Sequence, residues 1–114
     1  MSAASHLPPS EAIPLESLIV PTPQGIASRI LGKAAGGNVT LFAFDAAQGL
    51  EEHTSPFDAL VIVLEGTLVL TIGGAAVRAT PGSVVRMPGG VSHAVDAPEA
   101  TRMLLVMLRE VKGA

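Results

Sequence analysis

The sequence contains no cysteine, no tryptophan and no tyrosine, and few of its residues are charged. Without cysteine there are no disulfide bonds, thiolate nucleophiles or thiolate zinc sites, which leaves histidine and carboxylate side chains as candidate metal ligands. The charged share of 15% is low beside the roughly 25% of ordinary soluble domains. The formal net charge of -3 argues against a nucleic-acid partner, because phosphate backbones attract basic proteins.

Long hydrophobic runs are also missing. Apolar runs such as residues 59–64 are far shorter than the roughly 20 residues of a membrane-spanning helix. The first residues lack the basic start and unbroken apolar stretch of a secretory signal. We therefore expect a cytoplasmic protein with no membrane partner. Hydrophobic residues still make up 48% of the 114 residues, which suits a single domain with one core.

Proline and glycine divide the chain into two parts. Five of the nine prolines lie in the first 23 residues, so residues 1–25 are predicted to form an arm, with a short helical turn near residues 15–20 and an inert His6. Residues 26–114 are predicted to form one all-β barrel domain, because short β-branched runs alternate with turn residues. The predicted strands are residues 26–31, 39–44, 49–54, 59–64, 67–72, 76–79, 83–87, 93–95 and 103–108. The last run also fits a buried helix, but we favour a strand.

Three turns are predicted to fix the register of these strands. The pair Gly73-Gly74 suits a two-residue hairpin, which requires positive φ at both central positions. Residues 80–83 (TPGS) and 87–90 (MPGG) each place proline second and glycine third, as a type II turn requires.

Two of the predicted strands, residues 39–44 and 103–108, are apolar on both faces. One face must fill the barrel, and the other must be covered as well. In a chain without long helices we expect a second copy to cover it, which makes the protein a homodimer. The alternative is that the N-terminal arm folds back over the outer face.

Histidines in two separate strands are the main candidates for chemistry. Glu51, His53 and Ser55 lie two residues apart, so an extended strand would place their side chains on one face. His93 lies between Val91 and Val95 on a second apolar strand. A histidine on such a wall is more often a packed core residue than a ligand, so a site requires the two strands to meet.

Acidic residues surround the first histidine. No basic residue lies between Lys33 and Arg78, whereas that stretch contains Asp45, Glu51, Glu52, Asp58 and Glu65. A bound cation would be attracted there. A solvated acidic rim is the simpler interpretation.

The two histidine segments resemble the paired motifs of the cupin superfamily, whose members are small antiparallel jelly-roll barrels. In the first motif, His53 takes the place of the leading histidine and Gly66 that of the closing glycine. The second motif is matched by Gly82, Pro88, Gly90 and His93. The resemblance covers about residues 39–108 and implies a double-stranded β-helix fold.

Other motif positions differ from the family pattern. Ser55 stands where a second metal-binding histidine is usual, Ala59 where a glutamate (or a histidine in some small members) is usual, and Ala97 where an asparagine closes the second motif. In members with the full set, histidine and carboxylate ligands hold Mn, Fe, Ni, Cu or Zn. The resemblance implies that His53 and His93 are the remaining pair. A third ligand would have to come from Glu51, Asp58 or a bound molecule.

Residues 39–66 also resemble a group of uncharacterised bacterial single-domain cupins that carry HT, a small residue and then PFDAL. This resemblance implies that the missing ligands are a pattern of that group. We expect no organic cofactor.

These features support two hypotheses. The first is a small-molecule binding barrel, metal-free or weakly metallated, and the alternative is a metal-dependent enzyme of the dioxygenase, isomerase or decarboxylase type. The low ligand count favours the first and leaves enzymatic activity open. Phe57 is either a cavity wall or core, Asp58 either a ligand anchor or a turn cap, and Arg86 is expected at an outward-facing rim. The predicted ligand contacts are Ser55, Phe57, Asp58, Ala59 and Met87.

Overall fold

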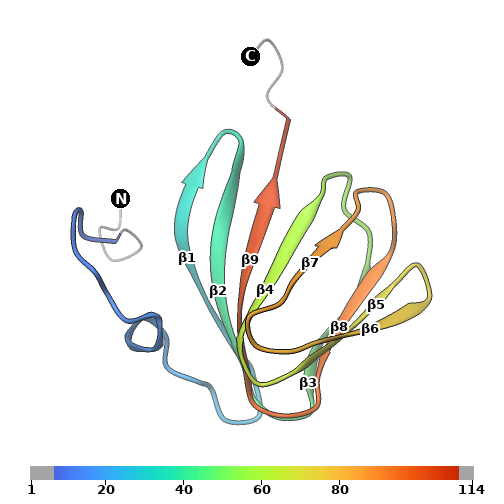
Figure 1. Cartoon of the computed structure of the whole chain (residues 1–114), viewed down its shortest axis with the longest axis horizontal. Helices are drawn as coiled ribbons and strands as arrows, with labels where there is room; N and C mark the ends of the chain where they lie inside the picture. The colour runs from blue at the N-terminus through green and yellow to red at the C-terminus, as the bar shows by residue number, and fades with distance from the viewer. Residues whose placement is uncertain (1–6, 111–114) are drawn as a thin grey trace.

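The computed structural model describes residues 7–110, which form two antiparallel sheets and one short helical turn (Figure 1). His6 and residues 111–114 lie outside this range. The strands are β1 (Ile26–Ala34), β2 (Gly37–Phe44), β3 (Gln48–His53), β4 (Ala59–Glu65), β5 (Leu68–Ile72), β6 (Ala75–Ala79), β7 (Val84–Met87), β8 (His93–Ala97) and β9 (Thr101–Leu108). Each predicted strand is present, and the ambiguous last run is a strand. No helix within residues 7–110 is long and apolar enough to cross a membrane.

The connections between strands give a jelly roll. One sheet has the order β1-β2-β9-β4-β7 and the other has the order β3-β8-β5-β6. Strands distant in sequence therefore lie side by side, with β9 between β2 and β4, and β8 between β3 and β5. This arrangement confirms the predicted all-β fold class, and it places both histidine segments at the pairing of β3 with β8.

The core lies between the two sheets. Along β4, the side chains of Ala59, Val61 and Val63 are buried and alternate with half-buried Leu60 and Ile62. This period of two means that one face of the strand points into the barrel while the other stays outside. The buried core residues are Phe44, Ala59, Val61, Val63, Leu68, Leu70, Ala79, Met87, Val95, Ala97 and Met103.

Two of the three predicted turns have the expected form. Gly73 and Gly74 both have positive φ (57° and 86°), as the hairpin between β5 and β6 requires. Gly82 has a φ of 86°, and the Ser83 N–H donates to the Thr80 carbonyl at 3.0 Å.

The third turn begins one residue later than predicted. Gly90 has the positive φ (80°), and the Val91 N–H donates to the Pro88 carbonyl at 3.4 Å. Gly89 is needed for another reason, because a β-carbon there would overlap the backbone of Pro56 and Phe57. The loop before β8 can therefore approach the loop after β3.

The N-terminal arm covers part of the outer face of the larger sheet (Figure 1). It contains a 3-10 turn, η2 (Leu15–Leu18), in the region where a helical turn was predicted. Ile19 after this turn is only 7% exposed and packs with Leu41 and Ala43 on β2. For β1 and β2, the cover over the outer face is thus the arm itself, which is the alternative to a second copy.

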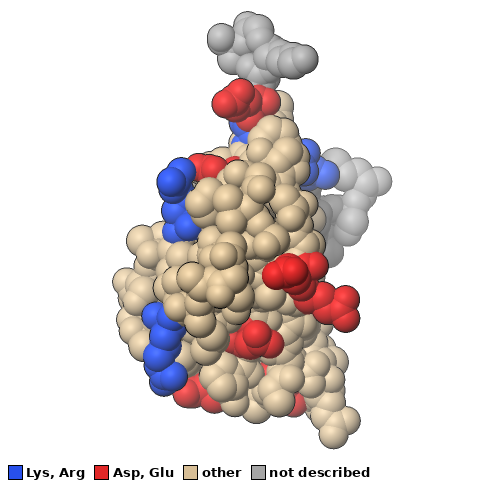
Figure 2. Space-filling view, turned by 90° about the vertical axis from the view of Figure 1, so that its right-hand side faces the viewer, with Lys and Arg blue, Asp and Glu red and all other residues tan. Residues whose placement is uncertain are grey.

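Figure 2 shows the side of the molecule where β5 and β6 lie in Figure 1, and charged side chains of both signs are scattered over its mainly uncharged surface. Two of the acidic residues predicted to surround His53 have other neighbours. Asp45 accepts the Gln24 N–H at 2.6 Å and the Ala46 N–H at 2.9 Å, and Glu65 pairs with Arg102 at 2.7 Å. These two carboxylates stabilise the arm junction and the larger sheet.

Candidate functional site

A small cavity lies inside the barrel, with a volume of about 50 Å³. Its lining comes from strands of both sheets and from the loop after β3. The lining residues are Leu50, His53, Ser55, Ala59, Met87, His93, Val95, Met103, Leu105 and Met107. Among the described residues, the polar side chains in this lining are two imidazoles and one hydroxyl.

The two histidines meet at one end of the cavity. His53 ends β3 and His93 begins β8, and the two residues are partners across the antiparallel pair. Their Nε2 atoms lie 3.1 Å apart, and their rings cross at 70° with centroids 4.3 Å apart. His93 is only 4% exposed, whereas His53 is exposed. The pair therefore joins the closed interior to the solvent.

Backbone carbonyls favour hydrogen on Nδ1 of each ring. Nδ1 of His53 lies 3.0 Å from the Glu51 carbonyl oxygen, and Nδ1 of His93 lies 3.3 Å from that of Val91. A carbonyl oxygen only accepts hydrogen bonds, so we infer that both Nδ1 atoms donate to these carbonyls. The two Nε2 atoms also lie within hydrogen-bond distance, and a neutral ring with hydrogen on Nε2 would donate to the other ring. With hydrogen on both Nδ1 atoms, both Nε2 atoms instead present lone pairs to each other. A hydrogen-bond donor or a cation at this point would relieve the repulsion.

A β-bulge in β3 changes which residues face the cavity. The register with β8 shifts between Leu50 and His53, so both of these side chains line the cavity. Glu51 is exposed and lies outside the lining. The expectation that Glu51 shares a face with His53 is wrong, because the bulge interrupts the simple alternation of a strand.

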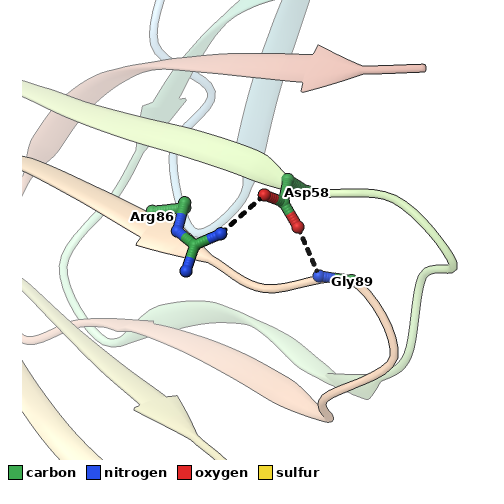
Figure 3. Close-up of polar contacts among 3 residues, drawn as sticks. All are labelled: Asp58, Arg86 and Gly89. Carbon is green, nitrogen blue, oxygen red and sulfur yellow. Dashed lines mark hydrogen bonds and ion pairs between the residues drawn. The ribbon is translucent and has the colours of Figure 1, made fainter. Parts of the chain in front are cut away.

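Asp58 acts as a turn cap outside the cavity. Its Oδ1 accepts the Gly89 N–H at 2.8 Å, and its Oδ2 pairs with Nη1 of Arg86 at 2.8 Å (Figure 3). The Gly90 N–H donates to the Ser55 carbonyl at 2.8 Å. These bonds tie the loop before His93 to the loop after His53. Arg86 is exposed, as expected of a rim residue, and its partner is this structural carboxylate.

Phe57 also lies outside the cavity. Its side chain is 36% exposed and lines a surface groove with Leu108 and Arg109. It is neither the cavity wall nor a core residue, because the loop after β3 leaves the sheet before this position. Of the predicted ligand contacts, Ser55, Ala59 and Met87 do line the cavity.

Several lining residues were not predicted from the sequence. Met103, Leu105 and Met107 alternate along β9, and their inward face forms one wall of the cavity. Their period of two was visible in the sequence. The sequence did not show that β9 pairs with β4, and this pairing brings the inward face of β9 opposite the histidines.

The residues present do not form a set of the kind that the family uses for divalent metals. Within residues 7–110, no group of three or more His, Cys, Asp or Glu side chains is placed to hold an ion. Neither Glu51 nor Asp58 lines the cavity, and neither forms such a group with the imidazole pair. A divalent ion normally recruits three or four protein ligands, so the imidazole pair falls short of the usual set for such an ion.

The cap provided by Asp58 has a consequence for pH dependence. The Gly89 N–H, followed by the Arg86 guanidinium, holds the pKa of Asp58 below its ordinary value. A lowered pKa stabilises the fold above the unfolded-state value of about 4, and this stability is lost as pH falls through the folded-state value. We expect Asp58→Asn to unfold at lower urea concentration than wild type at neutral pH, with a smaller difference near pH ~3.

Urea unfolding at the two pH values measures this difference directly. Asp96→Asn provides the control, because Asp96 is an exposed β8 residue. Its midpoint should stay close to that of wild type at both values. An Asp58→Asn midpoint that differs from wild type equally at both pH values would contradict the assigned role of the ionised cap.

The two antiparallel sheets and the histidine-lined cavity define a jelly-roll barrel that encloses a small interior site. A family model described as a cupin domain matches residues 40–108. The chain therefore belongs to the cupin family, as the two sequence motifs indicated.

Solved structures agree with this assignment. A conserved protein of unknown function from Streptococcus pyogenes is 30% identical, with 92% of each chain covered and a TM-score of 0.86. A cupin superfamily protein from Desulfitobacterium hafniense DCB-2 is 26% identical, with 91% of this chain and 95% of that chain covered and a TM-score of 0.84. No curated protein matches the chain. The match gives fold and family, so function must be argued from the cavity.

Proposed function

We propose that the barrel binds a small, mainly apolar molecule whose polar group donates hydrogen bonds to His53 and His93. The observation that carries this proposal is the pair of Nε2 atoms, 3.1 Å apart, whose Nδ1 partners are backbone carbonyls. In the inferred tautomer, both Nε2 lone pairs lie at one end of a cavity whose other lining residues, apart from Ser55, are apolar. An O–H or N–H group of a ligand would satisfy them there.

The size of the cavity limits this ligand. A volume of about 50 Å³ is well below the ~150 Å³ of an apolar cavity that binds benzene. Methionine side chains have three rotatable bonds and adapt readily. A ligand of aromatic size would therefore enter by displacing Met87, Met103 or Met107.

Phenol, toluene and benzoate test this proposal as probes of similar size. We expect phenol to shift the backbone amide resonances of Leu50, Ala59 and Val95 in ¹⁵N-labelled protein. Toluene should bind more weakly because it lacks the donor, and benzoate should bind more weakly because its charge would be buried. In His93→Ala the preference for phenol over toluene should disappear.

A matched control uses Glu52→Gln, which changes an exposed side chain next to His53. This variant should bind phenol as wild type does. Phenol shifts that are confined to the outer surface, or that are unchanged in His93→Ala, would overturn the proposal.

A metal-dependent enzyme is the second candidate. It is favoured by the hydrogen bonds from both Nδ1 atoms to carbonyls, an arrangement typical of histidines that bind metals through the other nitrogen. Elemental analysis of wild type, His53→Ala and His93→Ala after metal-replete expression tests this candidate. Stoichiometric metal in wild type that is lost in both variants would support it, and a metal-free wild type would oppose it.

We also propose that the protein is a homodimer, with the outer face of β4, β7 and β9 at the interface. Leu60, Ile62 and Val106 lie on this face beyond the part that the arm covers, and Val84 beside them is 60% exposed. Burying such a surface against its copy would remove apolar area from water.

Sedimentation of Ile62→Lys tests the homodimer. We expect wild type to sediment as a dimer at micromolar concentration and Ile62→Lys as a monomer, because the new charge would be buried at the interface. Val20→Lys is the control, since Val20 is 82% exposed on the arm, and it should remain dimeric. A monomeric wild type or a dimeric Ile62→Lys would contradict the proposal.

A further inference from the structure

Ser55 adds a hydroxyl group to the residues that line the cavity. Its Oγ accepts the Phe57 N–H at 3.3 Å, a local bond of the kind that serine forms in turns. Within residues 7–110, the hydrogen of this hydroxyl has no acceptor. A serine hydroxyl has one hydrogen to donate, so Ser55 can donate a hydrogen bond to a ligand.

The backbone holds Ser55 close to the imidazole pair. Ser55 follows His53 by two residues, and its carbonyl oxygen accepts the N–H of Gly90, shortly before His93, at 2.8 Å. His53 and His93 are themselves partners across β3 and β8. The loop after β3 and the loop before β8 therefore bring Ser55 and both imidazoles to the lining of one cavity.

We infer that the cavity selects molecules that carry a neutral primary carboxamide group on a short apolar chain. With hydrogen on both Nδ1 atoms, the lining offers two acceptors, the Nε2 atoms 3.1 Å apart, and one donor, the Ser55 hydroxyl. A primary carboxamide has the matching set, because its NH₂ group donates two hydrogen bonds and its carbonyl oxygen accepts. This inference rests on the proposed function and narrows it to one class of ligand.

Other polar groups match the lining less well. An alcohol or a phenol has one hydrogen for two Nε2 atoms, and a ketone has none. A carboxylate or an ammonium group would bring a charge into a cavity whose lining, among the described residues, includes no carboxylate, lysine or arginine. A neutral carboxamide brings no charge and leaves neither Nε2 atom without a partner.

The volume of about 50 Å³ limits the apolar chain of the ligand. Leu50, Val95 and Leu105 supply apolar contacts in the lining. A short aliphatic amide such as propionamide has fewer non-hydrogen atoms than phenol, so it requires less displacement of the methionine side chains. We therefore expect an aliphatic chain on the carboxamide.

Titration of ¹⁵N-labelled full-length protein with propionamide and with butanone tests this selectivity. The two probes share their shape and their carbonyl group, but butanone has a methyl group in place of NH₂. Both should shift the amide resonances of Leu50, Ala59 and Val95. Propionamide should bind about tenfold more tightly, because it alone donates to the Nε2 atoms. In His93→Ala this preference should be lost.

Ser55→Ala removes the donor for the carbonyl group of the ligand. Propionamide and butanone should each lose about threefold or more in affinity, whereas toluene has no carbonyl group and should bind as it does to wild type. Thr54→Ala is the matched control, because Thr54 is an exposed neighbour outside the cavity lining. This control should bind propionamide as wild type does.

The inference is overturned if wild type binds butanone as tightly as propionamide, or if Ser55→Ala binds propionamide as wild type does. The proposed function survives either result when phenol still binds in preference to toluene and this preference requires His93. If none of the probes shifts the resonances around the cavity, both the inference and the proposed function fail.

Discussion

Gly66→Ala is expected to lower the free energy of unfolding by about 3 kcal/mol or more. Gly66 joins β4 to β5 with a φ of 81°, a region that costs other residues about 1–2 kcal/mol. A β-carbon at this position would also overlap the Ala100 carbonyl oxygen and Thr101. Both are backbone or buried neighbours that cannot move aside easily, so overpacking adds to the conformational cost.

Gly74→Ala separates these two costs. Gly74 has a similar φ of 86°, but no atom lies within 4 Å of a β-carbon built there. This variant should lose only about 1–2 kcal/mol. Urea unfolding of both variants gives the comparison, and a Gly66→Ala protein as stable as Gly74→Ala would contradict the packing argument.

The requirement at Gly66 gives a physical reason for the glycine that closes the first cupin motif. The next residue, Thr67, donates its backbone N–H to Oγ1 of buried Thr101 at 3.0 Å, and that hydroxyl lies 3.0 Å from the Thr67 carbonyl. The chain passes from one sheet to the other at this point. The tight fit of Gly66 against β9 therefore sets where β5 begins.

Met103→Ala should be the second strongly destabilised variant, with a loss of about 2–5 kcal/mol. Met103 is 0% exposed, belongs to the core and lines the cavity. Removing its side chain enlarges the cavity, so a ligand of aromatic size should enter without displacing other groups. Phenol should then raise the melting temperature of Met103→Ala more than that of wild type, because it binds only the folded state.

Val63→Ala is the matched control for this effect. Val63 is a buried core residue outside the cavity lining. Its truncation should lower the melting temperature, and phenol should then raise it no more than in wild type. If phenol stabilises Val63→Ala as strongly as Met103→Ala, the gain does not come from the cavity around the histidines.

Local patterns in the sequence were sufficient to predict most of the fold. Each strand was marked by a short apolar run, and the turns at Gly73-Gly74 and Gly82 were marked by the conformations that glycine allows. The third turn was misplaced by one residue because two adjacent glycines serve different needs. Gly90 supplies the positive φ, whereas Gly89 permits close approach to the loop at Pro56.

The candidate site was harder to predict than the fold. The motif spacing was sufficient to identify His53 and His93, but the bulge that turns Glu51 outward leaves no local signal in the sequence. The wall formed by β9 depends on long-range pairing with β4. Asp58 was open to two interpretations because the loop partner Gly89, 31 residues away, decides between them.

The cover over the outer face of the larger sheet was also difficult to predict from the sequence. Apolar residues on both faces of β2 indicated a cover, yet the pattern did not distinguish a second copy from the arm. The structure places Ile19 of the arm over Leu41 and Ala43. The rest of that face, on β4, β7 and β9, still has apolar side chains directed outward and carries the homodimer proposal.

The central claim is that both imidazoles carry hydrogen on Nδ1 and present unprotonated Nε2 atoms to each other. Long-range ¹H–¹⁵N correlation spectra of labelled protein test it directly, at a pH about two units above the ordinary histidine value of ~6.5. We predict the Nδ1–H tautomer for both His53 and His93, whose Nδ1 atoms face the Glu51 and Val91 carbonyls. An Nε2–H tautomer at either ring would contradict the account.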